Sequence, residues 1–266
     1  MRKENLLDIA IQASIKAGKA ILNIYDLEEI EVFNKNDESP LTMADITSNN
    51  EITSLLKKTG IPIISEENKS IDSTVRSKWK TCWIIDPLDG TKEFIKRNGE
   101  FTVNVALVSE NTPILGVIYV PVTRELFFSH LAKQKAYKVI LDANHEFEGK
   151  MMIPEHEVSP KKEYTSNIKV VGSRSHMNEE TEVFVKELNK KYDSVEIVSV
   201  GSSLKFCLVI EGKADIYPRF APTMEWDTAA GHALCRSVGL NVVAKETGEP
   251  LLYNKEKLLN DHFIVK

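Results

Sequence analysis

Hydrophobic residues in the first 25 positions recur every three or four residues. They are Leu6, Ala10, Ala13, Ala17, Ile21 and Ile24. This spacing puts them on one face of a helix and predicts an amphipathic α-helix that ends near Tyr25. A second helix is predicted over residues 42–59, because Thr42 or Asp45 can cap its start and Gly60 can end it.

Short runs rich in β-branched and aromatic residues come next. They lie at 61–64, 81–85, 101–109, 114–120 and 125–130. Each has the length and composition of a strand, and the turn at 120–123 predicts that the last two form a hairpin. The following stretch, 131–165, is polar and has little periodicity from which elements can be assigned.

The pattern resumes with alternating strand-like and helix-like segments. Strands are predicted at 168–173, 194–200 and 214–220, and helices at 179–192, 203–212 and 227–239. In the last helix, Asp227 is expected at the N-cap and Gly239 just past the end. The alternation indicates a layered α/β (α+β) fold. A boundary near 150–167 would separate an N-terminal lobe, 1–165, from a smaller C-terminal lobe, 166–266.

Composition narrows the class of protein. Apolar residues make up 42% of the 266 positions, which is enough for a core without metal or disulfide staples. The 34 basic and 39 acidic residues give a net charge of −5, which argues against a nucleic-acid or acidic-membrane binder. An anionic ligand would therefore need a local device such as a metal ion or a helix start.

Cysteines and terminal sequence indicate the compartment. Cys82, Cys207 and Cys235 have no spacing typical of disulfides or zinc, and suit a reducing environment. The first 18 residues carry charges where a secretory signal needs an apolar stretch, and no apolar run reaches membrane-spanning length. We therefore expect a cytoplasmic protein without a transmembrane segment. Peripheral membrane association stays open, as does the choice between a monomer and a homodimer.

The most informative stretch is Asp86-Pro87-Leu88-Asp89-Gly90-Thr91, which follows the apolar run at 81–85. Two carboxylates three residues apart can converge on one point. The carbonyl of Leu88 lies between them, and such oxygens are the ligands that Mg²⁺ prefers. Gly90 and Thr91 would open a helix, whose free N–H groups suit phosphate. The alternative is a plain Asx turn followed by a helix cap.

Three further carboxylates stand at predicted element ends. Glu66 follows the run at 61–64, Asp45 lies in the first turn of the second helix, and Asp227 begins the last helix. Each has a simpler explanation: Glu66 as a solvated surface charge, Asp45 as a first-turn acid and Asp227 as an N-cap. Taken together, they suit metal-assisted hydrolysis of a phosphate ester.

Three segments together resemble the signature blocks of the inositol monophosphatase superfamily of Mg²⁺-dependent, Li⁺-sensitive phosphatases. They are 65–67, 83–94 and 225–234. Segments 89–107 and 201–220 are similar to the bacterial 3′(2′),5′-bisphosphate nucleotidases within that superfamily. The resemblance implies an αβαβα sandwich, a role in clearing a by-product of sulfate assimilation, and removal of the 3′-phosphate from 3′-phosphoadenosine 5′-phosphate to give AMP.

The resemblance also implies roles for individual residues. Two or three Mg²⁺ ions would be bound by Glu66, Asp86, the Leu88 carbonyl, Asp89 and Asp227. Thr91, supported by Asp45, would orient the attacking water, with Glu66 helping through its metal. The scissile phosphate would accept hydrogen bonds from Gly90 and Thr91, and the substrate site would also include Glu66, Leu88, Asp89 and Asp227.

The second phosphate or the nucleotide would contact Lys205 and Arg219, with Ser202 and Arg174 as further candidates. One departure bears on the substrate. Lys92 and Glu93 stand where inositol monophosphatases usually have a small polar pair, which favours the nucleotidase.

Two other hypotheses stay open at this point. One keeps the chemistry but changes the substrate to an inositol phosphate or a sugar bisphosphate. The other is a metal-binding or regulatory protein that has lost catalysis, although none of the expected ligands is missing.

A bisphosphate nucleotide carries about four negative charges, and bound Mg²⁺ would reverse the negative charge of the site that repels it. We therefore expect metal to bind before or together with substrate.

Overall fold

A seven-stranded sheet forms the centre of the molecule in the computed structural model, which describes residues 3–30, 32–34, 40–68, 71–161, 166–172 and 178–266. The strands lie in chain order, β3 to β9. They are β3 Ile63–Ser65, β4 Thr81–Asp89, β5 Thr102–Ser109, β6 Thr112–Val120, β7 Glu125–His130, β8 Lys135–Ile140 and β9 Glu157–Val158. Only the β3–β4 pair of this sheet is parallel.

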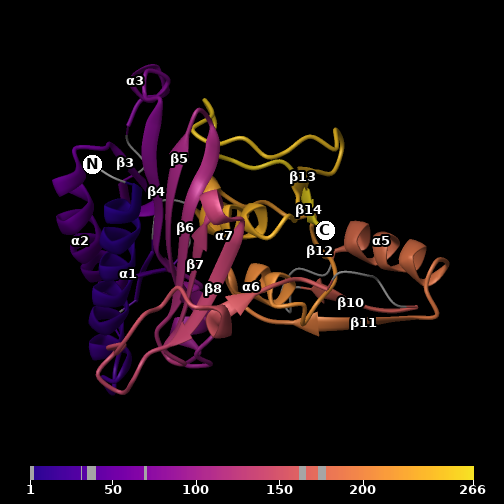
Figure 1. The fold of residues 1–266 in the computed structure, drawn as a ribbon, viewed down its shortest axis with the longest axis horizontal. Helices are drawn as coiled ribbons and strands as arrows, with labels where there is room; N and C mark the ends of the chain where they lie inside the picture. Colours follow the sequence, from indigo (N-terminus) through magenta and orange to yellow (C-terminus); the bar gives the residue numbers. More distant parts are fainter. Residues whose placement is uncertain (1–2, 31, 35–39, 69–70, 162–165, 173–177) are drawn as a thin grey trace.

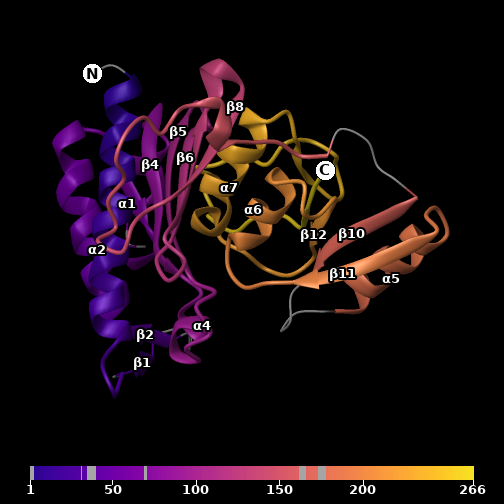
Figure 2. The same cartoon turned by 60° about the horizontal axis from the view of Figure 1, so that its bottom comes forward.

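Helices cover both faces of this sheet, as Figure 1 and Figure 2 show. One face carries α1 (Lys3–Tyr25) and α2 (Met43–Leu56), and the other carries α7 (Glu225–Ser237) with α6 (Leu204–Ile210) beside it. The next layer holds two small sheets, made of β12 Tyr217–Arg219, β14 Phe263–Val265 and β13 Val242–Ala244, and of β10 Asn167–Gly172 and β11 Ser194–Ser199. Helix α5 (Glu179–Asn189) lies outermost.

Short elements complete the chain. They are the hairpin β1 Val32–Asn34 and β2 Pro40–Thr42, the helices α3 Ser73–Arg76 and α4 Thr91–Ile95, and the 3₁₀ turns Lys57–Thr59, Glu66–Asn68, Leu131–Lys133 and Pro154–His156. The order of layers is the expected αβαβα sandwich. The division into lobes at 165 and 166 stays a prediction.

Strand β5 shows why the central strands read as continuous apolar runs. Val103, Val105 and Leu107 point into the core under α1, whereas Ala106 and Val108 point into the core under α7. Since side chains alternate across a strand, a sheet covered on both faces needs apolar residues at both parities.

Helix α7 lies directly on the backbone of β6. A Cβ atom at Gly116 would come within 2.3 Å of the Ala230 carbonyl oxygen and 2.8 Å of the Ala233 Cβ. Only glycine permits this approach. The first turn of α7, which carries Asp227, is thereby held close to the sheet.

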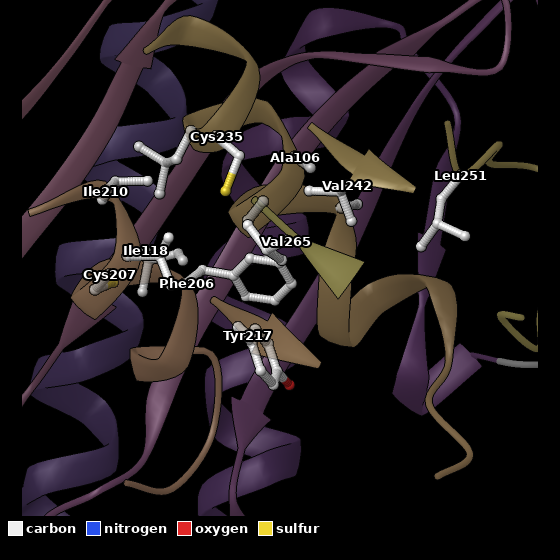
Figure 3. Packing of buried hydrophobic residues seen from close by; sticks show 14 of the residues in the cluster. Ala106, Ile118, Phe206, Cys207, Ile210, Tyr217, Cys235, Val242, Leu251 and Val265 are labelled. Carbon is white, nitrogen blue, oxygen red and sulfur yellow. The ribbon is translucent and has the colours of Figure 1, made fainter. Parts of the chain in front are cut away.

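The small C-terminal sheet packs on α6 and α7 through aromatic rings (Figure 3). The ring centroid of Tyr217 lies 5.2 Å from that of Phe206 and 5.5 Å from that of Phe263. All three side chains are buried. This core fixes β12 and α6, and therefore the positions of Arg219 and Lys205, relative to α7.

Most predicted elements are present, and the structure contains several further strands that the sequence did not predict, among them β8, β9, β13 and β14. The first helix ends at Tyr25 as predicted, and Thr42 caps α2 in a capping box with Asp45. The stretch at 131–165, left unassigned from sequence, contains β8 and β9. Strand β8 was overlooked because it is half-exposed and mixes lysines with its apolar residues, yet all six of its residues pair with β7.

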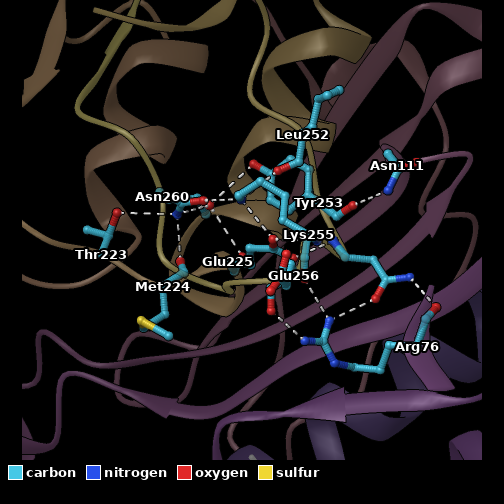
Figure 4. A network of polar contacts seen from close by, with 12 residues as sticks. Arg76, Asn111, Thr223, Met224, Glu225, Leu252, Tyr253, Lys255, Glu256 and Asn260 are labelled. Atoms are coloured by element: carbon cyan, nitrogen blue, oxygen red, sulfur yellow. Dashed lines mark hydrogen bonds and ion pairs between the residues drawn. The ribbon is translucent and has the colours of Figure 1, made fainter. Parts of the chain in front are cut away.

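A buried polar network holds the start of α7 against the C-terminal loop (Figure 4). The Arg76 guanidinium donates to the carbonyls of Lys255 and Glu256 at 2.9 and 3.0 Å and to Asn254 Oδ1 at 3.0 Å. Glu225, which is fully buried, accepts from the Lys255 backbone N–H and ammonium at 3.1 and 2.8 Å. The loop is thus fixed between a cation from α3 and an anion from α7.

We predict that Arg76→Met lowers the free energy of unfolding by about 2–4 kcal/mol, because the buried Asn254 side chain and two partly buried carbonyls lose a charged donor. Chemical denaturation of the two proteins measures this. Lys186→Met, at an exposed position of α5, is the control and should change the free energy by less than about 0.5 kcal/mol. An equal effect of the two substitutions would contradict the anchoring role.

Candidate active site

Three carboxylates far apart in the chain meet at one point. Asp86 and Asp89 come from the end of β4 and Asp227 from the first turn of α7, and their oxygens lie within 4.8 Å of one another. Residues three apart in a regular strand face opposite sides. The β4–β5 register shifts between Asp86 and Asp89, and this irregularity allows both side chains to face the same site.

Burial and mutual repulsion raise the pKa of all three carboxyl groups. Burial, followed by the charges of Glu66 and Asp89, raises the pKa of Asp86 well above its usual range. The pKa of Asp227 rises to about 8 for similar reasons. That of Asp89 rises only to about 6, because Lys205 and hydrogen bonds oppose the effect of burial. A divalent cation would relieve this repulsion.

The prediction that Asp227 is an N-cap residue is wrong. Helix α7 begins at Glu225, with Met224 at the N-cap, and Asp227 is the third helical residue. Its Oδ2 accepts a hydrogen bond of 2.8 Å from the Met224 N–H. The acid therefore caps the helix from inside its first turn, as in a capping box.

Glu66 and Leu88 lie next to this cluster. Strand β3 runs parallel to β4, with Ser65 opposite Ile85, so Glu66 leaves the sheet beside Asp86. Its charge and a hydrogen bond to Asp86 contribute to the raised pKa of that carboxyl. The Leu88 N–H donates to Asp86 Oδ1 at 3.1 Å.

Thr91 and Asp45 form a hydrogen-bonded pair beside the cluster. The Thr91 hydroxyl lies 3.1 Å from Asp45 Oδ1, and the other Asp45 oxygen accepts from the Thr42 N–H and hydroxyl, both at 2.7 Å. The hydroxyl hydrogen of Thr91 is thus directed to a carboxylate. Its oxygen lone pairs are available to accept a hydrogen bond from a water molecule.

Gly90 and Ser202 pack against each other where the N-terminal and C-terminal segments meet. The Ser202 hydroxyl oxygen lies 2.7 and 2.8 Å from the Asp89 and Glu100 carbonyl oxygens, which share its one hydrogen. A Cβ atom at Gly90 would come within 2.2 Å of that hydroxyl oxygen, and Gly90 has a φ of +96°. Because its hydrogen goes to backbone carbonyls, a contact of Ser202 with substrate stays a prediction.

A pocket of about 160 Å³ opens beside the carboxylates, and its lining residues include Asp89, Asp227, Lys205 and Arg219. Lys205 is buried, and desolvation lowers its pKa to about 8. Its ammonium donates to the Ser202 carbonyl at 3.0 Å. Arg219 donates to the Pro222 carbonyl at 3.3 Å, while its buried Nε has no hydrogen-bond partner among the described residues.

Sequence reasoning missed part of this site. Glu93 and Glu100 also line the pocket, and Glu93 was noted only as a departure from a family pattern. Thr102 and Asn104 contact Asp89 from β5. The sequence feature that could have identified them is the presence of two polar residues in a mostly apolar strand. Arg174 lies outside the described residues.

No helix in the described part of the chain is long and apolar enough to cross a membrane.

Comparison with known proteins identifies the family. The model of the inositol monophosphatase family matches residues 2–262. The 3′(2′),5′-bisphosphate nucleotidase CysQ of Escherichia coli K12 is 42% identical over 264 residues, which cover 98% of this chain and 99% of that protein. The CysQ of Haemophilus influenzae is 32% identical over 271 residues, covering 98% and 93%.

Solved structures agree with this result. The crystal structure of CysQ from Bacteroides thetaiotaomicron is 51% identical, with a TM-score of 0.88 over 98% of this chain and 97% of that one. The suhB protein of Bartonella henselae, at 22% identity and a TM-score of 0.73, over 98% and 93% of the two chains, shares the fold. The expected α/β sandwich is confirmed, and the chain belongs to the inositol monophosphatase family.

Proposed function

We propose that this protein is a Mg²⁺-dependent 3′(2′),5′-bisphosphate nucleotidase that hydrolyses 3′-phosphoadenosine 5′-phosphate to AMP and phosphate. The observation that carries the proposal is a cluster of three carboxylates, the buried Asp86 and the half-buried Asp89 and Asp227, beside a pocket that also contains Lys205 and Arg219. Relatives of nearly the same length are named for this activity. The proposal places the protein in the cytoplasm and in sulfur metabolism, with Li⁺ as an inhibitor.

The donor set fits Mg²⁺. Oxygen ligands would come from Glu66, Asp86, the Leu88 carbonyl, Asp89 and Asp227, for two or three ions. Hard oxygen donors of this kind suit Mg²⁺ rather than a thiophilic metal. When bound, the ions would supply Lewis-acid polarisation of the phosphate and charge neutralisation.

Thr91 and Asp45 would position the attacking water. Asp45 holds the Thr91 hydroxyl hydrogen, so the Thr91 oxygen accepts a hydrogen bond from the water and directs it towards phosphorus. The backbone of Gly90 and Thr91 begins α4, and its N–H groups would donate to the scissile phosphate. Orientation of the water in this way lowers the entropic part of the barrier.

Lys205 and Arg219 would bind the second phosphate. Both line the pocket that Asp89 and Asp227 border, so a ligand can reach the carboxylate cluster and the two cations together. If the substrate has a single phosphate ester, no anion is left to pair with Lys205 and Arg219. This arrangement favours a bisphosphate over an inositol monophosphate.

Metal binding and pH should be coupled through the carboxyl groups. The folded-state pKa values of Asp89 and Asp227, about 6 and 8, lie above the pKa of an aspartate in the unfolded chain, which is about 4. Their contribution to stability is therefore complete below about pH 4 and is lost as the pH rises through about 6 and 8. Metal-free protein should lose stability between pH 5 and about pH 8.5.

Saturating Mg²⁺ should raise the melting temperature by roughly 5–10 °C at about pH 8, and much less near pH 5, where protons compete with the ion. Thermal denaturation with and without Mg²⁺ measures this, with NaCl of equal ionic strength as the control. Asp227→Asn should abolish most of the increase. A Mg²⁺ effect that is the same at both pH values would contradict the coupling.

Thr91→Val should reduce kcat for phosphate release from 3′-phosphoadenosine 5′-phosphate by about 10²–10⁴-fold, with a small change in KM. The matched control is Thr74→Val. Thr74 also donates to an aspartate, Asp72 at 2.6 Å, but on the exposed surface, and this variant should keep full activity. Retention of wild-type kcat by Thr91→Val would exclude the proposed role.

Lys205→Met should raise KM for the bisphosphate about 10–100-fold, because it removes a charged donor to the second phosphate. The KM for a nucleoside 3′-monophosphate should change little. Lys213→Met, at an exposed lysine just beyond α6, is the control. Equal effects of Lys205→Met on both substrates would remove Lys205 from the specificity role.

A further inference from the structure

The first and third residues of β5, Thr102 and Asn104, are polar, and apolar packing does not explain why. Thr102 and Asn104 have the same parity along the strand as Ala106 and Val108, which face the core under α7. Both are buried, with exposed fractions of 0% and 1%. A buried amide or hydroxyl is costly unless it is fully hydrogen-bonded.

Their hydrogen bonds form a chain with one direction. The Ser203 hydroxyl donates to Asn104 Oδ1 at 2.7 Å. Because a serine hydroxyl has one hydrogen, the 2.7 Å contact between Thr102 and Ser203 is donated by Thr102. The Asn104 amide nitrogen then donates to Asp89 Oδ2 at 3.3 Å. The opposite amide orientation would put the Asn104 carbonyl oxygen against a carboxylate.

This chain selects the Asp89 oxygen that faces the cluster. Oδ2 accepts from the Asn104 amide and from the Ser203 backbone N–H at 2.6 Å, while the Thr102 hydroxyl, whose hydrogen goes to Ser203, lies 3.5 Å away. Within the described part of the chain, the hydrogen bonds to the Asp89 carboxylate all go to Oδ2. Oδ1 is therefore the oxygen left for a cation.

The same contacts join the two ends of the site. Ser203 immediately precedes α6, whose second residue is Lys205, while Asn104 and Asp89 belong to the central sheet. A rotation of Asp89 would break contacts with both segments. The orientation of one carboxylate is thus linked to the position of the pocket lysine.

We propose that Asn104 and Ser203 are positioning residues that orient Asp89 as a ligand for the divalent ion. This inference rests on the proposed Mg²⁺ dependence, but it concerns metal affinity rather than the substrate. Hydrogen bonds to a metal-binding side chain commonly change metal affinity by about 10–100-fold. Asn104 and Ser203 act on the metal through Asp89 and need not touch the substrate.

The test is calorimetric titration of metal-free protein with Mn²⁺ and Mg²⁺. Asn104→Leu and Ser203→Ala should weaken metal binding by about tenfold or more, and should raise the Mg²⁺ concentration needed for half-maximal activity by a similar factor. At saturating Mg²⁺, kcat should return to within a few-fold of wild type. Ser203→Ala keeps its backbone N–H and loses one hydroxyl, so it carries the test if Asn104→Leu does not fold.

The matched control is Ser129→Ala. Ser129 is a buried serine of β7 whose hydroxyl oxygen accepts a hydrogen bond from the Gly116 N–H at 2.8 Å. Its loss should lower stability without changing metal affinity. Lowered melting temperatures with unchanged metal dissociation constants in the Asn104 and Ser203 variants would overturn the inference.

The result is separable from the proposed activity. Weakened Mn²⁺ binding in the variants supports the positioning role even if the wild-type protein releases no phosphate from the nucleotide, an outcome that overturns only the proposed substrate. Absence of any divalent-ion binding by the wild-type protein would overturn both.

Discussion

Repulsion among closely spaced carboxylates is the constraint on which the rest of this structure depends. Asp86, which is buried, and the half-buried Asp89 and Asp227 bring oxygens within 4.8 Å of one another. Negative charges held this close in a medium of low dielectric destabilise the fold unless they bind protons or a cation. The packing around the site must therefore hold these groups where isolated side chains would move apart. The same repulsion would favour binding of a divalent ion at this site.

Separate attachments oppose this repulsion. Asp86 and Asp89 lie on either side of a distortion in β4, where the Ser48 hydroxyl binds the Pro87 carbonyl at 2.6 Å. Asp227 is held by α7. Glu225 fixes the start of this helix, and Ala230 and Ala233 pack closely on Gly116 of β6. None of these contacts lies in the pocket. The stability of the scaffold thus offsets the instability of a functional site, as is common in enzymes.

Local signals predicted much of the fold and the chemistry, but not the long-range geometry. The apolar period of α1 and the cap at Thr42 are local, and both were predicted. The predicted position of Asp227 in its helix was wrong. The sequence cannot distinguish an acid at the N-cap from one inside the first turn, because the difference lies in the backbone conformation of the preceding residues. The contact of Ser203 with Asn104 joins residues 99 positions apart and has no local signature. The sequence does show two polar residues, Thr102 and Asn104, in a mostly apolar strand. This pattern indicates a buried hydrogen-bond network, but it does not show that Ser203 takes part in it.

The pocket charges suggest why metal should precede substrate. Without a divalent ion, Lys205 is attracted to Asp89 and Asp227, and it opposes the rise in the pKa of Asp89. In that state the single lysine offsets only part of the negative charge of the carboxylates, so a bisphosphate would meet an acidic pocket. If a cation occupied the carboxylates, Lys205 and Arg219 would be free to face a phosphate, and the metal and the two side chains would all attract an anion. Asn104 and Ser203 link Asp89 to the segment that precedes α6, so the residues proposed to orient Asp89 for the metal would also hold Lys205 in place for the substrate.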